Sequence, residues 1–312
     1  MPLSLYDPWV PPFTSGLIPK QTGISRLGIR LAWEKIVIAR KIRNLFFSML
    51  LCRQDYFSLY KRLFLECGFP FEEKIDWRRP FIIGIKESKI LSMNPSSLDF
   101  PRKYPPNCQY APSRVDLNRE DPMLNRRYAR VMEEVCLQKQ QRPDTKIIYC
   151  FSSTVMGFEK RSKIIFMKIR DICLRNPQFV FILSVGKYHN TSYLLPCPSN
   201  LYVFQQVPQL HLLSYCDLMI TSGGMNSIAE CIEKEVPMLV CPLSLKSDQL
   251  GNSARVVYHG LGLRARIKLD SSRTIEKRIV QLFENYATFK RNLSMMRTKI
   301  LAESTAINTE VI

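Results

Sequence analysis

The sequence lacks the patterns that mark several common classes of protein. Its ten cysteines include no C-x-x-C pair, so neither a zinc site nor a thioredoxin-like redox centre is indicated. Histidines number only three. No run approaches the roughly 18–20 apolar residues that span a bilayer, and the first residues lack the order of a signal peptide. We therefore expect a soluble or peripheral protein of the reducing cytoplasm.

Acidic residues are few relative to basic ones. Lys and Arg total 45 against 27 Asp and Glu, a formal net charge of +18. Such a charge is typical of a protein that binds nucleic acid or an anionic membrane, or that has a solvated basic surface. No RNA-binding, helix-turn-helix or zinc-finger pattern accompanies it, so nucleic acid is not an expected partner.

The basic residues are concentrated near the N-terminus. Between Lys20 and Leu63 there are ten Lys and Arg but two acids, and apolar residues such as Ile38 and Phe46 recur at helical spacing. Two helices are expected, broken near Cys52–Asp55. Basic and amphipathic helices are typical of a membrane interface, which makes peripheral contact on the inner membrane face one interpretation. An ordinary surface helix packed on the core is the more common alternative.

The second half of the chain alternates apolar runs with helical patterns. Runs without polar alternation are expected to be strands of a parallel sheet covered on both faces. Five such runs begin at Lys146, Phe179, Leu201, Asp217 and Pro237, and a helix is expected from Ile275 to Met296. This pattern predicts an α/β, Rossmann-like domain over residues 141–312, with a different region and a charged linker over 1–140.

Ligands of such sheets bind beyond the carboxyl ends of the strands. Ser152-Ser153-Thr154 follows the first expected strand, and Thr221 to Ser227 follows the fourth. In the second stretch, Gly223 and Gly224 allow close approach to the backbone, and the helix start offers N–H groups to an anion. A diphosphate would fit there without a metal. A purely structural turn is the alternative, because a Gly-Gly pair before a helix is common.

Polar residues around this turn favour the ligand interpretation. Glu230 lies one turn after Ser227 and could bind two ribose hydroxyls. Asp248 and Gln249 follow the neighbouring strand, where a carboxylate and an amide can bind hexose hydroxyls. Upstream, the segment Gln206–Gln209 could close the pocket around a nucleobase.

The stretch VPQLHLLSYCDLMITSGGMNSIAECIEKEVPMLVCPLSLKSDQLGNSARVVYHGLG resembles the donor-binding signature of UDP-dependent glycosyltransferases. The similarity is greatest to bacterial macrolide and zeaxanthin glucosyltransferases, which Ser97-Leu-Asp-Phe-Pro-Arg-Lys also resembles. It implies two facing Rossmann-like domains of the GT-B type, the N-terminal one incomplete. It also implies inverting, metal-independent hexose transfer from a UDP-sugar to the hydroxyl of a hydrophobic acceptor such as a carotenoid.

The resemblance also implies residue roles. The diphosphate is expected at Gly223, Gly224, Asn226 and Ser227, the ribose at Glu230, the sugar at Asp248 and Gln249, and the uracil at Gln209 and the backbone of Val207. Ser222 stands where the family has His, and Thr154 at the first strand end completes the expected donor site. Ser153 and Gln206 also depart from the family's glycine and tryptophan. The loss of the histidine and the tryptophan is expected to weaken donor binding.

The family's catalytic base is a histidine near the start of the acceptor domain, and no histidine of this chain matches it. His259, in a Tyr-His-Gly turn, is expected to be structural. Roughly 100 family residues are expected to be missing before the first residue, so the chain alone is expected to transfer little sugar. Two alternatives are a non-catalytic nucleotide-sugar-binding subunit whose partner supplies the acceptor half, and a basic membrane-associated interaction protein.

Overall fold

The computed structural model describes residues 3–4, 26–76, 84–85, 90–92, 94–100, 108–110, 115–119, 126–151, 159–186, 190–244 and 248–310. The chain divides into two compact units. The first unit comprises Met1–Met93 and Pro101–Ala111, and the second comprises Asn94–Phe100 and Pro112–Ile312. The second unit therefore includes more than the expected donor domain of 141–312.

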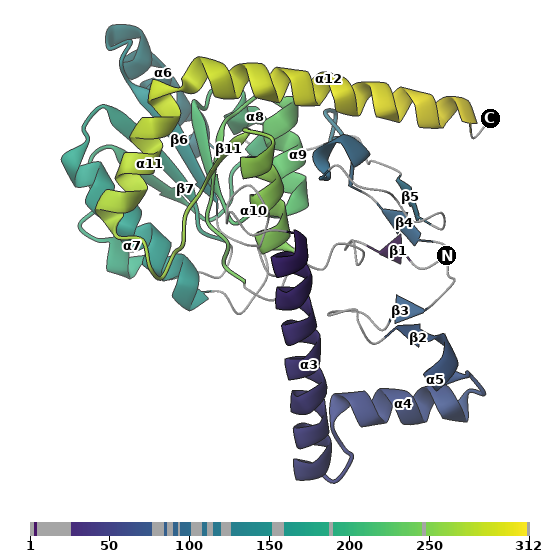
Figure 1. The fold of residues 1–312 in the computed structure, drawn as a ribbon. Helices are drawn as coiled ribbons and strands as arrows, with labels where there is room; N and C mark the ends of the chain where they lie inside the picture. Colours follow the sequence, from purple (N-terminus) through teal and green to yellow (C-terminus); the bar gives the residue numbers. More distant parts are fainter. Residues whose placement is uncertain are drawn as a thin grey trace. The chain divides into compact units, whose positions relative to one another are not determined.

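A parallel sheet of six strands forms the centre of the second unit (Figure 1). Its order is β11-β10-β9-β6-β7-β8, and every pairing is parallel. The strands are β6 (Lys146–Phe151), β7 (Phe179–Ser184), β8 (Leu201–Phe204), β9 (Leu218–Thr221), β10 (Met238–Val240) and β11 (Gly262–Arg264). The expected Rossmann-like α/β sheet is confirmed, and β11 extends it by one strand.

Helices cover both faces of this sheet. Along β6, Ile147 and Tyr149 belong to one buried cluster, and Ile148 and Cys150 belong to the other. Both sets are buried, which explains why the strands show no polar alternation. The first cluster includes residues of α6 (Arg126–Gln141), α8 (Gln209–Leu213), α9 (Met225–Glu233), α10 (Gln249–Tyr258) and α12 (Tyr286–Glu310), and the second includes residues of α7 (Glu159–Arg175) and α11 (Ser272–Glu284).

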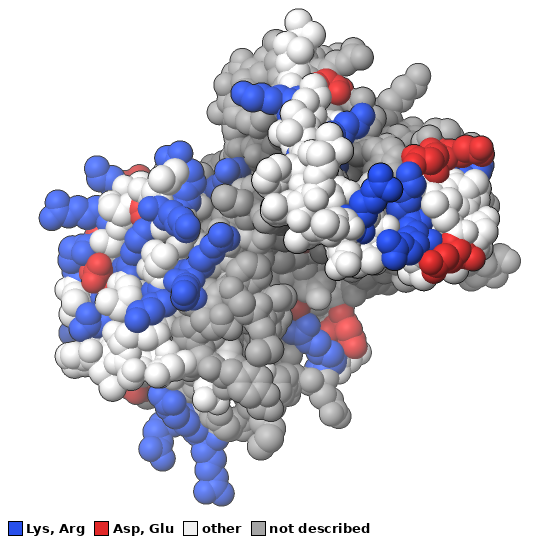
Figure 2. Space-filling view, turned by 90° about the horizontal axis from the view of Figure 1, so that it is seen from below, with Lys and Arg blue, Asp and Glu red and all other residues white. Residues whose placement is uncertain are grey.

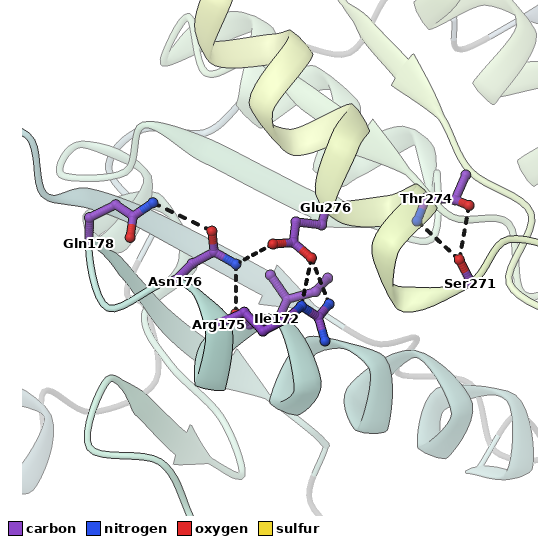
Figure 3. A network of polar contacts seen from close by, with 7 residues as sticks. All are labelled: Ile172, Arg175, Asn176, Gln178, Ser271, Thr274 and Glu276. Atoms are coloured by element: carbon purple, nitrogen blue, oxygen red, sulfur yellow. Dashed lines mark hydrogen bonds and ion pairs between the residues drawn. The ribbon is translucent and has the colours of Figure 1, made fainter.

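A polar network joins α7 to α11 (Figure 3). The Arg175 guanidinium donates to the Glu276 carboxylate at 2.9 and 2.6 Å, and Asn176 Nδ2 donates to the same carboxylate at 2.7 Å. Asn176 precedes β7, so the network lies at the amino ends of the strands. Because ligands of open parallel sheets bind at the opposite edge, we assign this network to stability.

The C-terminal helical pattern is divided in two. α11 ends at Glu284 with Asn285 as its C-cap, and α12 begins at Tyr286. α12 also contacts a short 3₁₀ helix, η1 (Ser96–Leu98), through the Glu303 carboxylate, which accepts from the backbone N–H groups of Ser96 and Ser97 at 2.9 and 2.7 Å. This contact holds the segment 94–100 to the second unit.

The first unit contains two helices joined by a turn, and small sheets. α3 (Arg26–Leu50) and α4 (Tyr56–Glu66) flank a turn at residues 51–55, which confirms the expected break. The strands of the first unit are β1 (Leu3–Ser4), β2 (Ile75–Asp76), β3 (Gly84–Ile85), β4 (Ile90–Ser92) and β5 (Cys108–Tyr110). The helix α5 spans Phe71–Lys74. β1, β4 and β5 pair in parallel. None of the described helices is long and apolar enough to cross a membrane.

Candidate functional site: the carboxyl ends of β6, β9 and β10

The strand order of the six-stranded sheet reverses at β6. The chain proceeds from β6 to β7 and β8 on one side, and then crosses back to β9, β10 and β11 on the other. In open parallel sheets, ligands bind at such a switch point, beyond the carboxyl ends of the strands. Here those ends are the residues after β6, β9 and β10. Thr154 follows β6 and lies outside the described residues.

Gly223 forms the turn after β9. Its φ of +89° favours glycine, and an added Cβ would lie 2.8 Å from Val240 Cγ1 and 3.3 Å from the backbone oxygen of Gln249. The Gly223 carbonyl accepts from Asn252 Nδ2 at 3.0 Å. The turns after β9 and β10 are therefore in direct contact, and the orientation of the Gly223 peptide is held by α10.

α9 begins immediately after this turn. Gly224 is its N-cap residue, and no side chain caps the helix. The first N–H groups of a helix have no partner within it and carry partial positive charge, which suits phosphate oxygens. Asn226 is exposed, whereas Ser222 and Ser227 are buried. The structure therefore brings together the residues that the sequence analysis assigned to the diphosphate.

Glu230 is a buried carboxylate, 3% exposed, one turn further along α9. Its Oε1 accepts from Arg119 Nη1 at 2.6 Å, and its Oε2 accepts from Gln209 Nε2 at 2.7 Å. Gln209 Oε1 in turn accepts from the hydroxyl of Tyr149 at 3.0 Å. Burial raises the pKa of the Tyr149 phenol well above its ordinary value, so the hydroxyl keeps its proton and orients the Gln209 amide.

The loop after β10 presents the third part of the site. Asp248 is the N-cap residue of α10, and its carboxylate accepts from Asn252 Nδ2 at 2.9 Å. Burial raises the pKa of the Asp248 carboxyl, although the hydrogen bond from Asn252 opposes the shift. A perturbed carboxyl at a strand end is typical of a functional site.

Gln249 differs from Asp248 in its contacts. Its Oε1 accepts from the backbone N–H groups of Leu243 and Ser244 at 2.8 and 2.9 Å. The side-chain amide oxygen of Gln249 therefore holds the loop in shape. The local sequence pattern does not reveal this contact.

A buried ion pair connects the segment 94–100 to the residues of the site. Arg255 on α10 pairs with Asp99 at 3.2 Å and donates to Asn252 Oδ1 at 3.3 Å. Asn252 is the residue that contacts both Gly223 and Asp248. His259 Nε2 lies 3.0 and 3.1 Å from the carbonyl oxygens of Leu98 and Asp99, a position that supports its expected structural role.

The residues expected at the uracil lie in α8 and in the loop before it. Val207 is buried and Gln206 exposed in the loop between β8 and α8. Gln209 is the first residue of α8, and its side chain contacts Glu230 and, at 3.4 Å, Ser227. Sequence reasoning missed Arg119, Tyr149 and Asn252, because their roles depend on contacts distant in sequence. The described residues contain no group of three or more His, Cys, Asp or Glu placed to hold a metal.

Comparison with known proteins points to one family. Residues 190–302 match the family model described as UDP-glucoronosyl and UDP-glucosyl transferase. NDP-glycosyltransferase YjiC of Bacillus subtilis (strain 168) is 37% identical over 98 residues, which is 31% of this chain and 24% of the relative. Zeaxanthin glucosyltransferase of Pantoea ananas is 34% identical over 101 residues, 32% and 22% of the two chains. The aligned stretches thus span about a quarter of these relatives.

Solved structures share the fold. The glycotransferase of kitacinnamycin has a TM-score of 0.59 at 20% identity, covering 85% of this chain and 64% of its own. The spinosyn rhamnosyltransferase SpnG complexed with thymidine diphosphate has a TM-score of 0.55 at 17% identity, covering 74% and 59%. These likenesses confirm the expected glycosyltransferase fold class. The C-terminal part of the chain, residues 190–302, is a domain of the UDP-glucoronosyl and UDP-glucosyl transferase family.

Proposed function

We propose that the second unit binds a UDP-sugar across the ends of β9 and β10, and that the chain takes part in hexose transfer to a hydrophobic acceptor alcohol. The observation that carries this proposal is one arrangement at the switch point. There, α9 begins after the Gly223 turn without a side-chain cap, and the carboxylates of Glu230 and Asp248 lie beside the start of this helix. The zeaxanthin glucosyltransferases among the similar proteins support a lipophilic acceptor such as a carotenoid.

The diphosphate is proposed to bind at the first turn of α9. The N–H groups there supply partial positive charge without a metal ion. Ser222 is buried beside the turn and is neutral, so this contact relies on the backbone more than in relatives with a histidine. The Gly223 turn, tied to α10 through Asn252, keeps the helix start pre-formed for the ligand.

The ribose is proposed to bind at Glu230. A carboxylate can accept from two hydroxyls, but here both of its oxygens accept from Arg119 and Gln209. Donor binding therefore replaces or rearranges the Arg119 contact. The hexose is proposed to lie near Asp248, whose raised carboxyl pKa reflects its burial at the edge of the site.

In the proposed reaction, the acceptor oxygen attacks the anomeric carbon as the bond from that carbon to the diphosphate breaks. Direct attack inverts the anomeric centre. UDP departs with the bonding electrons, and the start of α9 stabilises the charge that develops. The acceptor proton passes to a base. Among the described residues we assign that role to none, because His259 contacts backbone carbonyls and His211 pairs with the Tyr128 hydroxyl at 2.9 Å. His189 lies outside the described residues.

The cysteines support a reducing compartment such as the cytoplasm. Nine cysteines are free among the described residues. Burial raises the pKa of the thiols of Cys150, Cys231 and Cys241, which keeps them protonated and unreactive.

Titration calorimetry with UDP and with UDP-glucose tests the donor proposal, with and without a chelator. We expect binding that the chelator leaves unchanged. Glu230→Ala should abolish binding of both ligands, whereas Asp248→Ala should remove only the extra affinity of UDP-glucose. The matched control is Glu233→Ala, which changes a carboxylate on the same helix that pairs with Arg297. Unchanged binding in Glu230→Ala would contradict the site.

A transfer assay with labelled UDP-glucose and a hydroxylated carotenoid tests the acceptor proposal. Because no base is assigned among the described residues, we expect the chain alone to give little labelled carotenoid. Abundant labelled carotenoid that disappears in Glu230→Ala would contradict that expectation and would support transfer by this chain. Donor binding without transfer would instead support the non-catalytic donor-binding subunit.

A further inference from the structure

α3 carries an apolar stripe that faces solvent and is interrupted at Glu34 and Lys35. Six apolar side chains spaced three, four or seven residues apart lie along one side of the helix. They are Leu27, Leu31, Ile38, Ile42, Leu45 and Met49, each between 55% and 66% exposed. Apolar side chains remain exposed through the turn and on α4, including Leu51, Leu59 and Leu63.

These helices differ from the ordinary surface helix that the sequence allowed. Such a helix buries its apolar face and exposes its polar face. Among the described side chains of α3 only Val37 is buried, and α4 buries none. A contiguous exposed apolar surface of this kind is typical of a docking surface.

The charges around the stripe have one predominant sign. Residues 26–66 hold nine Lys and Arg against three acids. Lys41, Arg43 and Arg62 are exposed. Figure 2, which views the side where α3 and α4 meet in Figure 1, shows basic side chains beside uncharged surface there, with acidic side chains next to some of them.

A groove between the helices adds to the basic character. It has a volume of about 340 Å³ and is lined by Arg40, Lys41 and Lys61, with Leu45 of the stripe at its edge. Glu72 is the acid among its lining residues and pairs with Lys61. Basic and apolar groups therefore adjoin each other at one surface.

We propose that α3 and α4 dock on an anionic lipid surface. The apolar stripe enters the boundary between headgroups and acyl chains, and the flanking Lys and Arg contact phosphate-bearing headgroups. A second copy of the chain fits less well, because it would bring two predominantly basic surfaces together. The surface belongs to the first unit and shares no residue with the proposed donor site.

Co-sedimentation of the whole chain with vesicles tests this proposal. We expect binding to vesicles of mixed phosphatidylcholine and phosphatidylserine, and much weaker binding to phosphatidylcholine alone. Raising the salt concentration should weaken the binding. Ile38→Asp/Ile42→Asp and Lys41→Glu/Arg43→Glu should each weaken partitioning on the order of tenfold or more.

The matched control is Leu174→Asp, which changes a leucine on α7 that is 64% exposed and should leave vesicle binding unchanged. Circular dichroism and UDP binding verify that each variant is folded. Three outcomes overturn the proposal: no binding to anionic vesicles, equal binding to neutral ones, or self-association that the Ile38→Asp/Ile42→Asp variant abolishes. The last outcome would assign the stripe to a second copy.

Discussion

At the scale of single residues, Arg119 forms an ion pair with Glu230, the carboxylate at which we propose that the ribose binds. The Arg119 side chain is 37% exposed and that of Glu230 is 4% exposed. The ribose hydroxyls and the Arg119 guanidinium would therefore compete for the same buried carboxylate. We therefore expect Arg119→Ala to tighten UDP binding severalfold in calorimetry, because a competitor for Glu230 is removed.

The matched control for this substitution is Arg297→Ala. Arg297 of α12 pairs at 2.8 Å with Glu233, which lies on α9 like Glu230 but outside the proposed donor contacts. It should leave UDP affinity unchanged. Weaker UDP binding by Arg119→Ala would mean that the guanidinium contacts the donor instead of competing with it.

Neighbouring glycines provide a second comparison between single residues. Gly223→Ala forces a side chain into a positive φ and against Val240, which should destabilise the fold by about 1–3 kcal/mol and weaken UDP binding. At Gly224 an added Cβ meets nothing within 4 Å, and φ is −65°. Gly224→Ala should therefore change stability much less. Urea unfolding and calorimetry measure both effects, and equal losses in the two variants would contradict this geometry.

His259 predicts a pH dependence. Burial lowers the pKa of its imidazole below the ordinary value, so the unfolded state binds the proton more readily than the folded state. Its stabilising contribution is present above about pH 6.5 and is lost as pH falls through the lower folded pKa. Urea midpoints should therefore fall as the pH drops below about 6.5. His259→Gln should reduce the change of the urea midpoint with pH. An unchanged pH dependence in this variant would mean that other groups cause it.

The residues proposed for the donor site could be selected from local sequence, whereas the contacts that support them could not. Gly223, Glu230 and Asp248 follow strand ends at recognisable spacings, and the structure brings them together. Arg119 lies 111 residues from Glu230 in sequence, so no local pattern could reveal their contact. The side-chain oxygen of Gln249 accepts from the backbone N–H of Leu243. Residue type alone cannot distinguish such a structural contact from a contact with a ligand.

At the scale of elements, α10 connects the segment 94–100 to the donor site. Arg255 joins Asp99 to Asn252, and Asn252 joins Asp248 and the Gly223 carbonyl. Both members of the Asp99–Arg255 pair are about 5% exposed. Removing one member of a buried pair costs about 3–5 kcal/mol, because the other charge is left without compensation.

We therefore expect Asp99→Ala to lower the free energy of unfolding by about 3–5 kcal/mol and to weaken UDP-glucose binding. Replacing both residues, as in Asp99→Ala/Arg255→Met, should recover part of the stability. Urea unfolding of the single and double variants measures this coupling. Additive losses would show that the pair does not act as a unit.

Element prediction succeeded where the pattern was long or uniform. The five apolar runs became β6 to β10 because both faces of the sheet are covered by helices. β11 was missed because its residues, Gly262-Leu263-Arg264, form no apolar run, unlike Met238-Leu239-Val240 of β10. α11 and α12 share one helical spacing, and the break at Asn285 interrupts the backbone without interrupting the apolar pattern.

At the scale of the whole molecule, the two units present different chemistry. The second has a six-stranded sheet, two buried clusters and the family match, whereas the first exposes basic and apolar residues on α3 and α4. Sequence periodicity predicted both helices, but it could not decide whether their apolar side is buried. That distinction depends on tertiary packing, which periodicity does not encode.

The most direct test of the central claim is to map where the donor binds. A UDP-glucose carrying a photoreactive azide on the uracil ring should label the purified chain. Peptide mapping should locate the label in the loop around Val207 and Gln209, with excess UDP protecting against it and Glu230→Ala greatly reducing it. Labelling elsewhere, or labelling that UDP does not prevent, would contradict a donor site at the ends of β9 and β10.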